Sequence, residues 1–105
     1  MDLEKRIKLI VEDLKRYKPK KVILFGSGAG GKFFDEYSDV DLVVIKDKVK
    51  KNFISRLGEV AKFVRPQLWP LDILVYSSKE IEKLKKESAF IKKILKEGKT
   101  IYEKN

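Results

Sequence analysis

The sequence predicts an α+β fold, in which helices pack on one small mixed β-sheet in the order αβ-turn-β-α-β-α. Three observations lead to this prediction. Short apolar segments typical of strands lie at residues 22–25, 39–45 and 71–76. Apolar residues at helical spacing precede, separate and follow these segments. The first two strand segments are joined by only a short connection, so the second strand should return beside the first.

The helices are predicted from apolar residues that recur every three or four positions. The first helix begins near Leu3 and should end before Pro19, because a residue that precedes proline avoids helical geometry. The second helix covers residues 53–64. The third follows Ser77, which stands three residues before Glu80 in a capping-box pattern.

This last helical segment is long, and it is expected to break near Ser88. Gly98 suits its C-terminus, and residues 100–102 should form a last short strand. A chain of 105 residues, of which 43% are hydrophobic, is predicted to build one core. We therefore expect a single domain over residues 1–105.

The sequence contains neither cysteine nor histidine. The absence of cysteine excludes disulfides, thiolate metal sites and a cysteine nucleophile. The absence of histidine excludes the commonest general base, the serine triad that uses it, and most zinc sites. Any metal ion must then be held by oxygen atoms, which favours magnesium, manganese or calcium.

The chain is strongly basic, with 25 Lys and Arg against 16 Asp and Glu and a net charge of +9. This balance attracts phosphates, nucleic acids or acidic partners. The lysines are interleaved with glutamates, and with 39% charged residues the surface also suits the ion-pair networks of a thermophile. No apolar run approaches the roughly 18 residues of a membrane span. The charged N-terminus lacks a signal peptide, so we expect a cytoplasmic protein that does not enter a membrane.

Aspartates open two of the predicted strands. Asp39 and Asp41 are two residues apart, so their side chains should point to the same face of the sheet. Asp72 stands second in the next strand along the chain. Aspartate is depleted in strands and is costly to bury unpaired. Asp39 taken alone is also explained as a strand-capping residue, whereas Asp41 and Asp72 are harder to explain without a cation.

The glycine-rich connection after the first strand matches two nucleotide-binding motifs. Gly26, Gly28 and Gly31 satisfy GxGxxG, and Asp47 lies where a ribose-binding acid would follow. From Gly26 the chain also reads GxxxxGK, but Phe33 replaces the Ser or Thr of a P-loop. Both motifs require a crossover helix, for which the short connection leaves no room. Taken alone, the glycines are also consistent with a surface turn.

A third interpretation accounts for all of these residues together. Gly26 and Ser27 end the first strand in a turn that can grip phosphates through backbone N–H groups and a hydroxyl. Asp39 and Asp41 would lie next to that turn, and Asp72 would join them from a neighbouring strand. Three such carboxylates can hold two divalent ions, which lie about 3.5–4 Å apart in phosphoryl-transfer enzymes. The pattern therefore predicts a metal-dependent nucleotide site.

The same residues resemble a known family. Gly26-Ser27, the SDVDL of residues 38–42, Asp72 in LDILV and the ending FIKKILKEGKTIYE are similar to the nucleotidyltransferase fold of the DNA polymerase β superfamily. The length resembles that of the minimal nucleotidyltransferases (MNT) of bacteria and archaea. One departure is that eleven residues separate Ser27 from Asp39, one more than is usual in the family.

The resemblance implies a role for each residue. Gly26 and Ser27 would contact the phosphates of the nucleotide. Asp39 and Asp41 would ligate two Mg²⁺ ions, for which Mn²⁺ could substitute, and Asp72 would complete the site of the ion that activates the attacking hydroxyl. Many relatives carry an arginine soon after the serine, where this chain has glycine and alanine.

The implied activity is transfer of a nucleoside monophosphate from ATP, or another NTP, to a hydroxyl. Members of the minimal family are commonly antitoxins paired with a HEPN toxin, which suggests a HEPN partner that this chain modifies by AMP transfer. One alternative is a non-catalytic nucleotide-binding or antitoxin subunit that acts by complex formation. Another is a stand-alone transferase for a small molecule or a nucleic acid, which the basic charge makes admissible.

Overall fold

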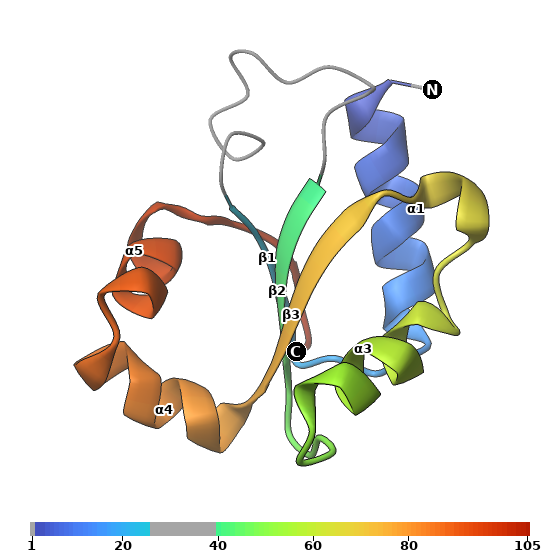
Figure 1. Ribbon diagram of the computed structural model, residues 1–105. Coiled ribbons are helices and arrows are strands. Elements are labelled where there is room, and N and C mark those ends of the chain that lie inside the picture. Colours follow the sequence, from blue (N-terminus) through green and yellow to red (C-terminus); the bar gives the residue numbers. More distant parts are fainter. Residues whose placement is uncertain (1, 26–39) are drawn as a thin grey trace.

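The computed structural model describes residues 2–25 and 40–105 (Figure 1). Its strands are β1 (Lys21–Phe25), β2 (Val40–Lys46), β3 (Leu71–Ser77) and β4 (Lys99–Glu103). They form a sheet in the order β3-β2-β1-β4, in which β1 is antiparallel to β2 and β4, and β2 is parallel to β3. The predicted mixed sheet, with the second strand beside the first and a last short strand, is therefore confirmed.

The helices are α1 (Leu3–Lys15), α3 (Phe53–Ala61), α4 (Ser78–Glu87) and α5 (Ala89–Glu97), and a short 3-10 helix, η1 (Pro66–Leu68), precedes β3. The second predicted helix is shorter than expected, because the chain leaves helical geometry after Ala61. In the part of the chain that the structure describes, no helix is both long and apolar enough to cross a membrane.

Polar side chains cap the helices where the sequence indicated. The Ser77 hydroxyl accepts from the Glu80 amide at 3.0 Å, and the Glu80 carboxylate accepts from the Ser77 amide at 2.8 Å. This reciprocal pair is the predicted capping box of α4. Ser88 ends α4 and caps α5 by accepting from the Ile91 amide, which confirms the predicted break.

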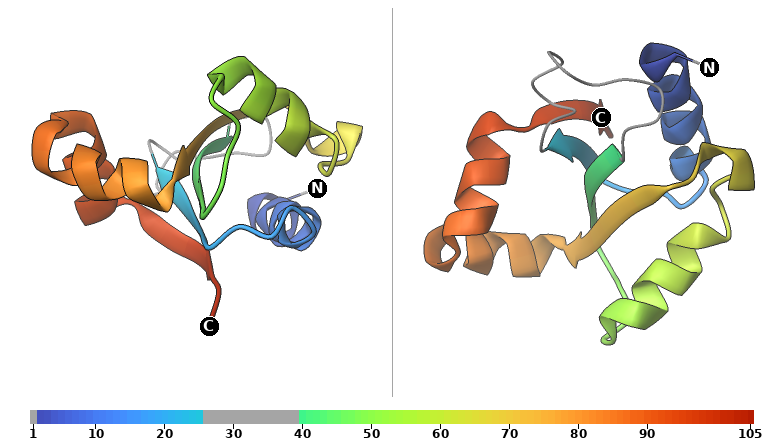
Figure 2. Two further views of the ribbon diagram at one scale, coloured as in Figure 1. Left: turned by 90° about the horizontal axis from the view of Figure 1, so that it is seen from below. Right: turned by 45° about the horizontal axis from the view of Figure 1, so that its top comes forward.

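The sheet separates two layers of helices (Figures 1 and 2). Helices α1 and α3 and the short helix η1 cover one face with the larger core, which includes Ile10, Leu14, Leu42, Val60 and Leu68. Helices α4 and α5 cover the other face with a smaller core built from Ile23, Val43, Ile45, Ile81, Ile91 and Ile94. Side chains of β2 alternate between the two cores, as the period of a strand requires.

Buried charged side chains of α1 form hydrogen bonds to the segment that leads into β3. Arg6 is buried and donates to the backbone carbonyls of Leu68 and Pro70 at 3.0 and 2.6 Å. Asp13 is also buried, and it accepts hydrogen bonds from the backbone amide and the guanidinium of Arg65. These hydrogen bonds hold the pKa of the Asp13 carboxyl below its usual value.

Gly98 ends α5 as predicted, but it does so in an extended conformation, with φ −70° and ψ 157°. A Cβ atom at this position would lie 2.5 Å from the Ile94 carbonyl oxygen and 2.6 Å from a methyl group of Ile23. Gly98 is therefore required by the close approach of α5 to β1, and not by a left-handed backbone.

Candidate functional site

Two of the predicted aspartates lie side by side on neighbouring strands. Asp41 of β2 is the register partner of Asp72 of β3 and also of Phe25 of β1. Paired residues of adjacent strands project from the same face of a sheet. The face is the one that α4 and α5 cover, because Val43 and Leu74, two residues farther along their strands, pack in that core.

The two carboxylates differ in exposure. Asp41 is half-buried between two neighbouring strands, whereas Asp72 lies exposed on the edge strand β3. Adjacent strands are about 4.8 Å apart, so the two side chains are close enough to share one ligand. Like charges that lie directly opposite each other destabilise a sheet. Carboxylate oxygens are also the ligands that Mg²⁺ prefers, so the pair fits a divalent cation in its donor chemistry.

The other predicted site residues, Gly26, Ser27 and Asp39, lie outside the described residues. In the sequence, Gly26 directly follows β1 and Asp39 directly precedes β2. Within residues 2–25 and 40–105, no group of three His, Cys, Asp or Glu side chains could hold a metal ion. The pair of Asp41 and Asp72 is therefore the part of the predicted site that the structure brings together.

An aromatic pair lies next to the carboxylates. Phe25, the register partner of Asp41, makes an edge-to-face contact with Phe90 of α5, with ring centroids 5.9 Å apart. Phe90 is 49% exposed. The contact joins the first turn of α5 to the end of β1. Phe25 lies in the same cross-strand row as its register partner Asp41 and the partner of Asp41, Asp72.

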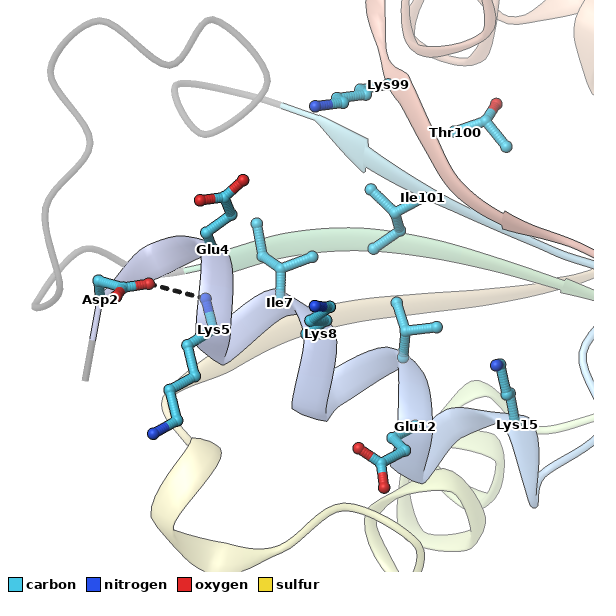
Figure 3. A pocket seen from close by; sticks show the side chains of 11 residues that line it. Asp2, Glu4, Lys5, Ile7, Lys8, Glu12, Lys15, Lys99, Thr100 and Ile101 are labelled. Atoms are coloured by element: carbon cyan, nitrogen blue, oxygen red, sulfur yellow. Dashed lines mark hydrogen bonds between the residues drawn. The ribbon is translucent and has the colours of Figure 1, made fainter.

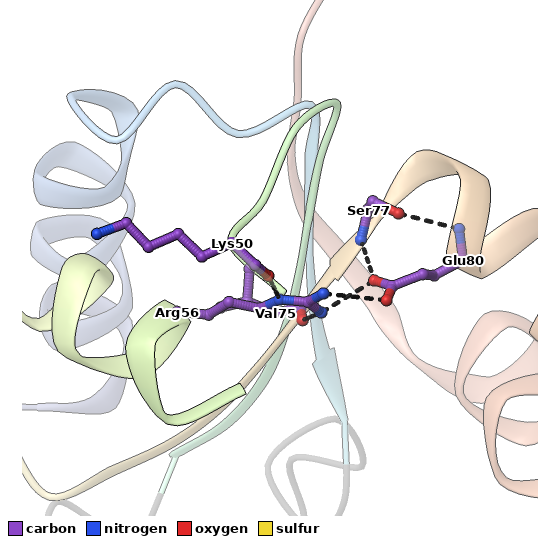
Figure 4. A network of polar contacts seen from close by, with 5 residues as sticks. All are labelled: Lys50, Arg56, Val75, Ser77 and Glu80. Carbon is purple, nitrogen blue, oxygen red and sulfur yellow. Dashed lines mark hydrogen bonds and ion pairs between the residues drawn. The ribbon is translucent and has the colours of Figure 1, made fainter. Parts of the chain in front are cut away.

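A polar network at the other end of β3 was not predicted (Figure 4). Arg56 of α3 is buried, and its guanidinium donates to the Val75 carbonyl oxygen at 2.9 Å and to both carboxylate oxygens of Glu80 at 2.9 and 3.0 Å. It also donates to the Lys50 carbonyl oxygen. One feature of the sequence could have indicated that Arg56 is buried. It lies four residues before the buried Val60, on the inward side of an amphipathic helix.

A cavity of about 770 Å³ lies between α1 and β4 (Figure 3). Its lining includes Ile7, Val11 and Ile101 together with acidic and basic side chains from the α1 segment and Lys99 of β4. Neither Asp41 nor Asp72 lines it. Its lining carries charges of both signs, so this cavity does not share the carboxylate chemistry of the aspartate pair.

Comparisons with known proteins bear on the family and the fold of the chain. The family model described as a nucleotidyltransferase domain matches residues 5–102. The fold is similar to the 1.40 Å crystal structure of a protein from Sulfolobus solfataricus that is named as a candidate nucleotidyltransferase. The TM-score is 0.65 at 21% sequence identity, and the similarity covers 95% of this chain and 82% of the other. No curated protein sequence matches significantly.

The match to the family model spans nearly the whole chain, and the similarity of fold extends over the same elements. Both findings support the predicted relationship to the DNA polymerase β-like superfamily, in which the minimal nucleotidyltransferases are found. The chain belongs to the nucleotidyltransferase domain family.

Proposed function

We propose that the protein transfers a nucleoside monophosphate, AMP from ATP, to a hydroxyl group in a reaction that requires Mg²⁺. The observation that carries this proposal is the register pairing of Asp41 with Asp72 on one face of the sheet. Two carboxylates placed side by side, in register with the last residue of β1, suit a cation bound to a triphosphate. Membership of the nucleotidyltransferase family supports the reaction class.

Each site residue has a role in this proposal. Asp39 and Asp41 hold the metal ions, Asp72 completes the ligand set, and Gly26 and Ser27 contact the phosphates. When bound, the ions would lower the pKa of the attacking hydroxyl and stabilise charge on the triphosphate, and Mn²⁺ would serve in place of Mg²⁺. Because the chain has no histidine, Asp72 is our candidate to accept the proton of the hydroxyl.

For the acceptor we propose a tyrosine hydroxyl of a HEPN-type partner protein, with this chain as the antitoxin of the pair. The resemblance to the minimal nucleotidyltransferases supports this acceptor. The position of Asp72 is compatible with it, because an exposed residue on an edge strand can be reached by a side chain of another protein. The net charge of +9 favours a nucleic-acid hydroxyl as the second candidate acceptor.

The experiment is incubation of the protein with ATP labelled at the α-phosphate and with Mg²⁺, in the presence and absence of the HEPN partner. We expect label on the partner, and none in EDTA or with Asp41→Asn. Asp47→Asn is the matched control, because Asp47 is an exposed aspartate just past the other end of β2. Label on nucleic acid alone would exclude the toxin as acceptor. Neutralisation of the toxin by Asp41→Asn without any transfer would favour a binding subunit.

A further inference from the structure

Helix α3 carries large apolar side chains on its solvent side. Ile54 is 81% exposed, Phe53 51% and Leu57 42%. Leu57 lies four residues after Phe53 and three after Ile54, so its side chain neighbours both of them along the helix, and we call the three residues the apolar strip. The inward side of α3 carries the buried residues Arg56 and Val60. Ile54 and Leu57 therefore lie outside the core, while the half-exposed Phe53 ring also contacts the Tyr76 ring, with centroids 5.8 Å apart. Contiguous exposed apolar surface is typical of interaction sites.

The rest of the helical surface is very different in composition. Helix α1 contains three lysines, α4 four and α5 three, whereas α3 contains none. The charged residues of α3 are Arg56, which is buried, and Glu59, which pairs with Lys50 at 3.4 Å. Gly58 follows Leu57, and a Cβ atom there would meet nothing within 4 Å. The outer side of α3 thus lacks the charge that covers the other helices.

Positive charge surrounds this strip. Lys48 and Lys51 are exposed just before α3, and Lys62 is exposed at its C-terminal cap. The first turn of α3 contains no acidic residue, so the positive end of the helix dipole adds to the lysine charges. An occupant with an apolar stripe and acidic flanks would complement both the strip and its rim.

A second copy of the chain complements this surface poorly. Antiparallel packing of two α3 helices would bring Lys51 of one copy toward Lys62 of the other, and each copy already carries a net charge of +9. We therefore propose that the apolar strip, Phe53, Ile54 and Leu57, is a docking surface for an acidic amphipathic helix of a partner protein. The proposal does not depend on the transfer reaction.

Docking at this strip leaves the aspartate pair accessible. Helix α3 packs on the face of the sheet that contains Leu42 and Ile73, whereas Asp41 and Asp72 project from the opposite face. Figure 2 shows α3 on the opposite side of the sheet from α4 and α5. The partner would bind one face of the sheet while the other face remains open to a nucleotide.

The test is calorimetric titration of the whole protein with a synthetic helical peptide that has leucine at alternating three- and four-residue spacings and glutamate elsewhere. We expect saturable binding that weakens with added salt, because the rim contacts are exposed ion pairs. Ile54→Lys should weaken binding at least about tenfold, as for a residue at the centre of an interface, and Lys51→Glu by less. Because Ile54 is 81% exposed, the Ile54→Lys variant should unfold at the wild-type temperature.

Matched controls separate binding at the apolar strip from non-specific electrostatic and hydrophobic binding elsewhere on the protein. Phe90→Lys changes the other exposed large apolar residue of the described chain, and Lys86→Glu changes an exposed lysine of α4. Both variants should bind the peptide as the wild type does. The proposal is overturned if the peptide fails to bind, or if a peptide with lysine in place of glutamate binds equally well. It is also overturned if sedimentation shows a wild-type dimer that Ile54→Lys dissociates, since the occupant is then a second copy.

Discussion

The two ends of the β2–β3 strand pair carry charge in opposite ways. At the end where both strands begin, Asp41 and Asp72, two groups of the same sign, are register partners. Toward the other end, the buried Arg56 is held by the Val75 carbonyl and by both oxygens of Glu80. Like charges opposite each other destabilise a sheet, whereas a buried ion pair makes the fold sensitive to the loss of either partner. The paired charges connect α3 to β3 and α4, whereas the aspartates are the residues that we propose to hold a metal ion.

The largest effect is expected where the charges are alike. Asp41→Asn or Asp72→Asn removes one of the paired carboxylates and should lower AMP transfer about a thousandfold, because a metal ion supplies several kcal/mol of transition-state stabilisation. The measurement is the rate of label transfer at saturating ATP and Mg²⁺. Each variant should keep the wild-type circular dichroism spectrum. Activity within tenfold of the wild type in both variants would show that this pair does not serve the reaction.

At the opposite end, removal of a charge should destabilise the folded protein. Arg56→Met removes a buried guanidinium that makes hydrogen bonds to α4, β3 and the Lys50 carbonyl, and it should lower the free energy of unfolding by about 3 kcal/mol. Glu80→Gln should cost less, because the Glu80 side chain is 35% exposed and water replaces part of the lost contact. Urea unfolding followed by circular dichroism measures both values. A loss under 1 kcal/mol for Arg56→Met would mean that the network does not hold the helices.

Acid should weaken the same network. Partial burial opposes ionisation of Glu80, but hydrogen bonds from Arg56 and from the Ser77 amide outweigh it and hold the pKa of Glu80 below its usual value of 4.5. A carboxyl group whose pKa is lower in the folded state than in the unfolded state stabilises the folded state at pH values above its pKa in the unfolded chain. This stabilisation is lost as the pH falls through its pKa in the folded state. The free energy of unfolding should therefore decrease as the pH is lowered from 4.5.

Glu80→Gln provides the control for this acid dependence. The variant should show a shallower fall in stability with acid than the wild type, measured by urea unfolding at a series of pH values. Part of the fall should persist, because hydrogen bonds from Arg65 also hold the pKa of Asp13 below its usual value. Identical acid profiles for the variant and the wild type would contradict the assignment of this pKa shift to folding.

How much of each end of the β2–β3 pair the sequence predicts depends on how far apart the interacting residues are in the sequence. The Ser77–Glu80 cap is local, with partners three residues apart, and it was predicted in full. The sequence also predicted that Asp72 joins Asp41 from a neighbouring strand, and the two are register partners. Their direct pairing depends on the register of two parallel strands that are far apart in the sequence, so no local pattern indicated it. The partners of Arg56 lie 19 and 24 residues away, so no local pattern indicated them.

The smallest predicted effect is the change in the free energy of unfolding that results from the repulsion between Asp41 and Asp72. Without a divalent ion, Asp72→Asn relieves the repulsion between register partners and should raise the free energy of unfolding by a few tenths of a kcal/mol. Saturating Mg²⁺ should reverse the order, because an ion that binds only the folded state stabilises the wild type by mass action. Thermal unfolding of both proteins in EDTA and in Mg²⁺ measures this crossing, with Asp47→Asn as control. If Mg²⁺ stabilises Asp72→Asn as much as the wild type, Asp72 does not hold the ion, and the like charges at this end of the sheet need another explanation.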